Sequence, residues 1–210
     1  MQGKPSADDS VDILDKQVLY QGYFRMEGYR LRHRLYGGGW SEEMHREIFE
    51  RGHAVGVLPY DPGLDSVVLI EQFRLGALLS GMTPWQIEIV AGMIDEGESA
   101  EAVALREAEE EAGCGVRDLV PIQRYLATSG ASTETVWLFC GRADARGLGG
   151  VHGLDHEHED ILAKVVPVEE AFALLDAGKI ENAAIIIALH WLRHHRPQLR
   201  DAWLTNGQNT

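Results

Sequence analysis

The spacing of apolar residues along the chain predicts a series of short strands, with helices toward the end. Runs rich in β-branched and aromatic residues, separated by glycine, proline and aspartate, are typical of strands. These runs are residues 18–24, 29–36, 53–58, 66–73, 85–91, 122–127, 135–140 and 161–166. A helical period is predicted instead for residues 168–177 and 183–195, and Pro197 is expected to end the second of these helices.

Strands mixed with a few helices, without strict alternation, predict an α/β (α+β) fold with a mixed sheet between helical layers. The strand-rich start is too short to bury a core alone, so it is expected to pack on the rest of its chain or on a second copy. We therefore expect an N-terminal antiparallel strand unit at residues 1–50, a main domain at 51–205 and a loose tail at 206–210.

Composition narrows the class of protein. The chain has 210 residues, and its net charge of −14 argues against binding to nucleic acids or anionic membranes. Two cysteines, Cys114 and Cys140, are too few for a disulfide framework and fit a reducing compartment. The start of the chain lacks the apolar core of a signal peptide, and the longest apolar run, residues 183–189, is too short to span a membrane. We expect a soluble cytoplasmic protein.

The segment REAEEEAG, residues 106–113, places several carboxylates within little more than one helical turn. Ser99 suits the N-cap of this helix, Glu101 its first turn and Gly113 its C-terminus. Like charges at helical spacing each cost about 0.2–0.5 kcal/mol, so either solvent or a bound cation must offset the repulsion. A solvated acidic face is the simplest interpretation.

The helical wheel favours a binding site. At 100° per residue, Glu107, Glu110 and Glu111 gather beside one apolar arc. The arc consists of Ala104, Leu105, Ala108 and Ala112. If this arc packs on a sheet, the carboxylates lie at the rim of the contact, where crowded oxygens suit a hard divalent cation. Arg106 stands at helical spacing from Glu110 and can hold its carboxylate.

These residues complete a known pattern. Gly92, five residues, Glu98, seven residues and then residues 106–114 resemble the complete Nudix box, with Ala108 and Cys114 in its apolar slots. Nudix proteins are typically Mg²⁺-dependent hydrolases of a nucleoside diphosphate linked to another group, built on an α/β/α sandwich.

The resemblance also implies roles within the box. Glu107 and Glu111 would bind metal together with the carbonyl oxygen of Ala91, and Glu110 with Arg106 would support them. The implied cofactor is Mg²⁺, with Mn²⁺ as a substitute left open, and more than one ion during turnover.

A second acidic cluster, DHEHED, occupies residues 155–160. It is either a solvated loop or, with His152, His156 and His158, a zinc site. Hydrolysis of a pyrophosphate favours a third interpretation, because a carboxylate must take a proton from the attacking water. Glu157 could be that base, and Glu159 a further metal ligand.

The similarity extends beyond the box. The segments HRLYGGG, REIFERGHA, LIEQFR, TPWQIEIVAGMIDEGES and GKIENAA resemble bacterial ADP-ribose pyrophosphatases, from about Asp15 onward. Such enzymes are dimers that split ADP-ribose into AMP and ribose 5-phosphate and exchange an N-terminal strand unit between subunits. The implied partners are a nucleotide sugar and a second copy of the chain.

By that resemblance, Glu157 would be the general base and Glu159 a metal ligand. Residues of several segments would bind substrate, with Tyr23 and Phe24 stacking on adenine from the partner subunit. The others are Arg46, Glu47, Arg51, Arg74, Met93 and Glu134. Ser129 stands where these enzymes usually carry a proline about sixteen residues beyond the box, which leaves the substrate range open.

Two other functions remain alternatives. The same chemistry could act on another sugar nucleotide, such as a GDP-sugar. The second alternative is a non-catalytic Nudix module that senses a nucleotide. The intact carboxylates and the absence of a basic patch count against it.

Overall fold

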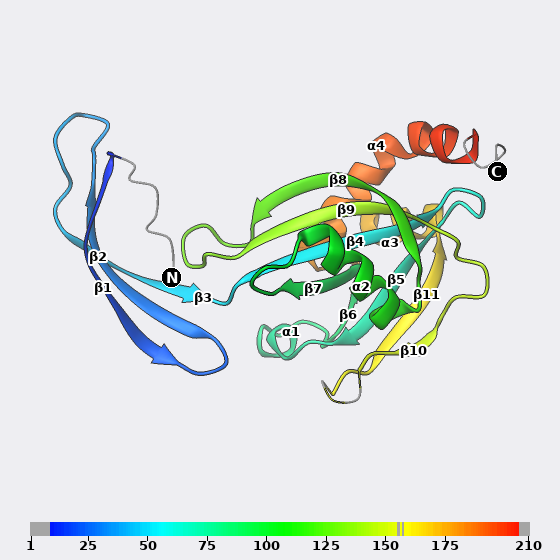
Figure 1. The fold of residues 1–210 in the computed structure, drawn as a ribbon, viewed down its shortest axis with the longest axis horizontal. Coiled ribbons are helices and arrows are strands. Elements are labelled where there is room, and N and C mark those ends of the chain that lie inside the picture. The colour runs from blue at the N-terminus through cyan, green and yellow to red at the C-terminus, as the bar shows by residue number, and fades with distance from the viewer. Residues whose placement is uncertain (1–8, 155, 157, 206–210) are drawn as a thin grey trace. The chain divides into compact units, whose positions relative to one another are not determined.

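The computed structural model describes residues 9–154, 156 and 158–205. Figure 1 shows the elements in chain order. The strands are β1 (Val11–Gln21), β2 (Arg25–His33), β3 (Met44–Glu50), β4 (His53–Asp61), β5 (Ser66–Phe73), β6 (Trp85–Glu88), β7 (Val90–Ile94), β8 (Val116–Leu126), β9 (Thr135–Ala143), β10 (Gly150–His152) and β11 (Ile161–Pro167). The helices are α1 (Leu75–Leu79), α2 (Ala100–Ala112), α3 (Val168–Asp176) and α4 (Ala183–Thr205).

The chain divides into two compact units. The smaller unit combines the residues up to His53 with Leu126–Thr135, and the larger unit contains Ala54–Tyr125 and the residues from Val136 onward. In the smaller unit, β1, β2 and β3 form an antiparallel sheet in that order. The loop 126–135 is tied to β3, because Phe49 donates its N–H to the carbonyl of Ala131 at 2.7 Å.

The larger unit is built around one mixed sheet, ordered β10-β11-β5-β4-β9-β8, with β6 beside β5 and β7 beside β4. Strands β4 and β9 run parallel, whereas β5 pairs antiparallel with β4, β6 and β11. The predicted mixed sheet is therefore confirmed, together with the small antiparallel sheet.

Apolar side chains alternate between the two faces of this sheet and create two cores. Val68 and Ile70 pack with α2 on one face, whereas Val67 and Leu69 pack with α3 and α4 on the other. Helices thus cover both faces, which is the predicted α/β/α sandwich.

The predicted end of the last helix at Pro197 is wrong, since α4 continues from Ala183 to Thr205. A proline inside a helix costs about 3 kcal/mol, so other contacts must offset that cost. Trp203 is buried against Tyr60, with ring centroids 6.1 Å apart. Arg200 Nη1 lies 2.6 Å from the carboxylate of Asp65. These contacts beyond the proline keep the chain helical.

Replacing Trp203 with Ala should therefore destabilise the protein by about 3–5 kcal/mol, because it removes a large buried ring. Chemical denaturation measures the loss. Leu204→Ala is the matched control on the same helix: its side chain is 44% exposed, and the free energy of unfolding should change by no more than about 0.5 kcal/mol. Equal effects of the two variants would contradict the packing argument.

Several predicted boundaries also differ from the structure. The predicted strand at residues 85–91 is divided into β6 and β7, which pair with different neighbours. β1 and β8 both start earlier than expected, and the short elements α1 and β10 were not predicted. No helix in the described part of the chain is long and apolar enough to cross a membrane.

Candidate functional site

Helix α2 begins and ends as its sequence predicts. The side chain of Ser99 accepts a hydrogen bond from the N–H of Ala102 at 3.1 Å, and Glu101 lies in the first turn. Gly113 ends the helix in the left-handed conformation, with φ of 56°, a backbone geometry that favours glycine. Helix α2 packs on strand β7, so that Glu107 and Glu111 lie against that strand (Figure 1).

The buried face of α2 is rotated relative to the predicted arc. Val103, not Leu105, completes it together with three alanines, and Leu105 is 41% exposed. On a wheel of 100° per residue, Val103 and Ala112 lie about 180° apart, with Glu111 between them. Glu111 is consequently 3% exposed, so it lies within the contact and not at its rim as the sequence suggested.

The Glu111 carboxylate is held directly against the sheet. Its Oε2 accepts a hydrogen bond from the N–H of Ala91 at 3.0 Å. Burial raises the pKa of Glu111 to about 8, and the nearby carboxylates of Glu107 and Glu159 raise it further against the lowering effect of Ala91. A bound divalent cation would stabilise the ionised form of this buried carboxylate, because it offsets the negative charge around it.

Glu107 lies over the backbone of Gly92. A Cβ atom at Gly92 would come within 2.0 Å of Oε1 of Glu107, so only glycine leaves room for this carboxylate. Arg106 Nη1 lies 3.0 Å from Glu107 and 2.8 Å from Glu110, and its Nη2 lies 4.0 Å from Glu98. The guanidinium of Arg106 thus lies between Glu107, a predicted metal ligand, and Glu110, whose carboxylate it was predicted to hold.

Gly92→Ala should lower the rate of metal-dependent turnover by about 10²-fold, because it displaces a carboxylate by more than an ångström. The fold should persist, since Gly92 does not have a positive φ. Activity titrated against Mg²⁺ measures the effect. Gly115→Ala is the control: a Cβ there meets nothing within 4 Å, and activity should stay at the wild-type level. Wild-type activity of Gly92→Ala would contradict the steric argument.

The titration of Glu111 has a testable sign. Its pKa in the folded protein, about 8, exceeds the ordinary value of 4.5, so the folded state holds the extra proton between these values. The free energy of unfolding of the metal-free protein should therefore fall as pH rises from about 5 through about 8. Thermal melts of wild type and Glu111→Gln at several pH values measure the contribution of Glu111 to this pH dependence. The variant should lack that contribution. Parallel pH profiles of the two proteins would contradict it.

The second acidic cluster lies only partly within the described residues. Glu157, the predicted base, is outside them. Glu159 is described, and its Oε2 accepts from the N–H of Leu154 at 3.1 Å. Within the described part of the chain, no three acidic, histidine or cysteine side chains already form a metal-binding group.

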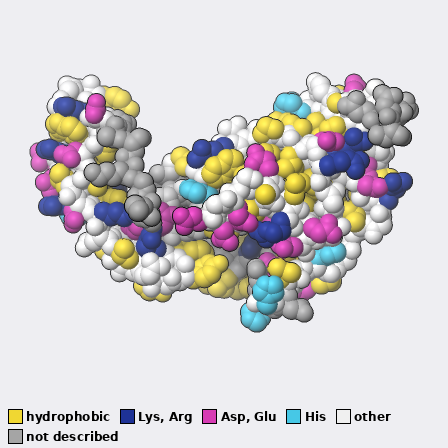
Figure 2. All heavy atoms as spheres, viewed as in Figure 1, with side chains coloured by type: hydrophobic (Ala, Val, Ile, Leu, Met, Phe, Trp, Pro, Cys, Tyr) yellow, Lys and Arg dark blue, Asp and Glu magenta, His cyan; other side chains and the backbone are white. Residues whose placement is uncertain are grey.

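Two predicted substrate residues lie near the α2 carboxylates in the larger unit. Arg74 directly follows β5, and its guanidinium interacts electrostatically with Glu111 and Glu159. Met93 lies in β7, two residues after Ala91. Figure 2 shows acidic and basic side chains side by side on the face of the larger unit in that view.

Four predicted substrate residues come together within the smaller unit. Arg51 Nη1 lies 3.0 Å from Oε1 of Glu134, and the guanidinium lies 5.5 Å from the centre of the Phe24 ring. Phe24 also packs edge-on against Phe49 and Tyr23, with ring centroids 5.1 Å and 4.7 Å apart. Tyr23 is 92% exposed, which leaves its ring open for stacking.

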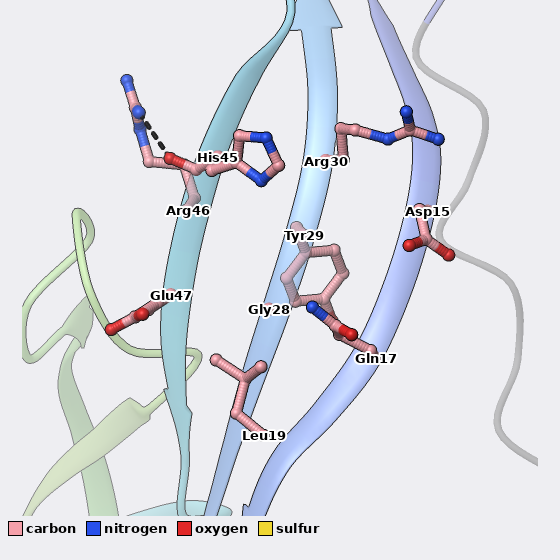
Figure 3. A pocket seen from close by; sticks show the side chains of 9 residues that line it. All are labelled: Asp15, Gln17, Leu19, Gly28, Tyr29, Arg30, His45, Arg46 and Glu47. Carbon is pink, nitrogen blue, oxygen red and sulfur yellow. Dashed lines mark hydrogen bonds between the residues drawn. The ribbon is translucent and has the colours of Figure 1, made fainter.

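Arg46 and Glu47 belong to β3 of the smaller unit. They line a hollow of about 320 Å³ on the small sheet, with Tyr29 and Gln17 (Figure 3). Arg46 Nη1 donates to the carbonyl of His45 at 2.7 Å.

Three polar residues were missed by the sequence analysis, of which Glu88 and Gln72 are buried. Glu88, Gln72 and Asn182 form one hydrogen-bond network around Arg74. One signal in the sequence could have revealed this network: the polar residues Gln86 and Glu88 alternate with apolar residues along one strand. A side chain so placed must find a partner inside the fold.

Comparison with known proteins identifies the family of this chain. The NUDIX domain family matches residues 50–189. An ADP-ribose pyrophosphatase of Escherichia coli is 49% identical over 195 residues, covering 93% of this chain and 93% of that protein. One of Haemophilus influenzae is 40% identical and covers 94% and 92%. A crystal structure described as an ADP compounds hydrolase has the same fold, with a TM-score of 0.71, 21% identity, and coverage of 93% and 100%. On these grounds, the chain belongs to the NUDIX family.

Proposed function

We propose that this protein is a metal-dependent hydrolase that splits the pyrophosphate of ADP-ribose into AMP and ribose 5-phosphate. The observation that carries the proposal is the pair of carboxylates on α2: Glu111 buried on the N–H of Ala91, and Glu107 seated over Gly92. The names of the relatives that match nearly the whole chain support ADP-ribose as the substrate.

The carboxylates of Glu107, Glu111 and Glu159 and the carbonyl of Ala91 would hold the cofactor, Mg²⁺ or Mn²⁺, with more than one ion during turnover. Bound divalent ions polarise the phosphoryl oxygens and neutralise developing charge. Arg106 keeps Glu110 and Glu107 in place.

Glu157 takes the proton from the attacking water, whose oxygen forms a bond to one phosphorus while the bridging P–O bond breaks. Arg74 binds a phosphate oxygen, since a guanidinium matches phosphate geometry. In the smaller unit, Tyr23 and Phe24 offer aromatic faces for adenine, and Arg51 with Glu134 offers charge-assisted hydrogen bonds for hydroxyl groups. Arg46, Glu47 and Met93 complete the proposed substrate contacts.

We also propose that the protein is a homodimer. Large apolar side chains of β1 are more than a third exposed and need a partner surface. They are Val11, Ile13, Leu14, Val18, Leu19 and Tyr20. Cys114 and Cys140 are buried free thiols, which is consistent with the reducing cytoplasm as location.

Product analysis in oxygen-labelled water tests the function. The protein incubated with ADP-ribose and Mg²⁺ should yield AMP and ribose 5-phosphate, and one of these two products should carry one labelled oxygen. A chelator should abolish the reaction. A parallel panel of substrates that includes a GDP-sugar measures the substrate range, which the presence of Ser129 in place of the usual proline leaves undecided. Tight binding of ADP-ribose without products would instead favour a nucleotide sensor.

A further inference from the structure

The carboxylate of Glu88 binds three side chains in the interior of the larger unit. Glu88 ends β6 and is 4% exposed. Arg74 donates to it from Nε, at 3.2 Å, and from Nη2, at 2.7 Å. Gln72 and Asn182 donate their amide groups at 3.3 Å and 3.1 Å. Both carboxylate oxygens are therefore occupied.

The donors are fixed in their own right. Arg74 directly follows β5, and its N–H donates to the carbonyl of Pro84 at 2.7 Å, beside the start of β6. Asn182 precedes α4, and its Oδ1 accepts from the N–H of Ala184 at 2.8 Å. Glu88 thus joins the end of β5 to the start of α4.

Arg74 is the member of this network that reaches the surface near the proposed metal ligands. Its side chain is 45% exposed, and it interacts electrostatically with Glu111 and Glu159. The guanidinium is planar, so an edge fixed on Glu88 leaves Nη1 to point elsewhere. Among the described residues we find no hydrogen-bond acceptor for Nη1.

A buried ion pair is weak evidence for stability, because desolvation of the two charges can exceed their attraction. Its geometry, however, restricts a side chain that otherwise has many rotamers, and orientation has large effects on catalysis. The network around Glu88 is consistent with such a role.

We propose that Glu88 is a positioning residue: it fixes the guanidinium of Arg74 beside Glu111 and Glu159, oriented to bind a phosphate oxygen of the substrate. The inference rests on the proposed function. Glu88 touches no reacting atom and acts through Arg74, with Gln72 and Asn182 holding its carboxylate.

Glu88→Gln keeps the shape and removes the charge that orients Arg74. We expect kcat/KM for ADP-ribose to fall by about 10²-fold. In an Arg74→Ala background the same substitution should change kcat/KM by no more than about twofold, because the residue it acts through is gone. Full activity of Glu88→Gln, or an equal loss in both backgrounds, would overturn the proposal.

Glu71→Gln is the matched control. Glu71 lies on β5 and pairs with Lys164 at 3.0 Å on the surface, so its loss should leave kcat/KM unchanged. If Glu88→Gln does not fold, Glu88→Asp replaces it, since the shorter side chain keeps the charge but withdraws the carboxylate from Arg74. A loss of about 10²-fold that disappears in the Arg74→Ala background supports the proposal, and wild-type activity overturns it.

A measurement without substrate separates this inference from the proposed function. The Nε–Hε signal of Arg74 in a ¹⁵N NMR spectrum should report a rigid guanidinium in the wild type and a mobile one in Glu88→Gln. An unchanged signal overturns the positioning role. A wild-type protein that leaves ADP-ribose intact overturns the function alone, because the NMR comparison still tests Glu88.

Discussion

Replacing Glu107 with Gln is expected to lower kcat/KM for ADP-ribose by about 10³-fold, the equivalent of about 4 kcal/mol of transition-state stabilisation. The substitution keeps the size of the side chain over Gly92 but removes one of the negative charges that attract a divalent cation. Steady-state kinetics over a range of Mg²⁺ concentrations measures the effect. Excess Mg²⁺ should restore only part of the activity, because an amide oxygen is a weaker ligand than a carboxylate.

The matched control is Glu109→Gln. Glu109 belongs to the same helix and the same acidic run, yet it points to solvent. Both variants lose one charge from α2, so a general field effect would lower their activities equally. The proposed metal site requires that Glu109→Gln retain wild-type kinetics.

Glu157→Gln should lower kcat by about 10²–10⁴-fold, the usual contribution of a general base. Metal binding should persist, because its proposed ligands are on other residues. The increase in Tm on adding Mg²⁺ measures this, since a ligand that binds only the folded state raises its stability.

Asp160→Asn, which changes an exposed carboxylate three residues further along the chain, is the control for Glu157→Gln and should leave kcat unchanged. Full activity of Glu157→Gln would assign the base elsewhere. If Asp160→Asn were as damaging as Glu157→Gln, the loop charge as a whole would be responsible.

Local chemistry explains why much of this protein could be predicted from its sequence. Ser99 and Gly113 mark the ends of α2 because a hydroxyl satisfies the first N–H groups and glycine adopts a left-handed conformation without strain. The sandwich follows in the same way, since buried strands and amphipathic helices each leave an apolar face to cover.

Long-range packing explains the errors. The continuation of α4 past Pro197 depends on the contacts of Trp203 with Tyr60 in β4 and of Arg200 with Asp65 in the turn after it, which no local pattern reveals. Likewise, the depth of Glu111 depends on where the sheet meets α2. Because its Oε2 accepts the N–H of Ala91, a carboxylate can lie within a contact that a helical wheel assigns to apolar residues.

The split of the smaller unit along the sequence has a consequence for protein engineering. Its strands come from the beginning of the chain, but Leu126–Thr135 belongs to it too, linked by Phe49 to Ala131 and by His53 to Thr135. Deleting the first 53 residues would leave Leu126–Thr135 without two of its hydrogen-bond partners, Phe49 and His53. The N-terminal unit is therefore not a detachable module, and chimaeras with relatives should exchange both segments at once.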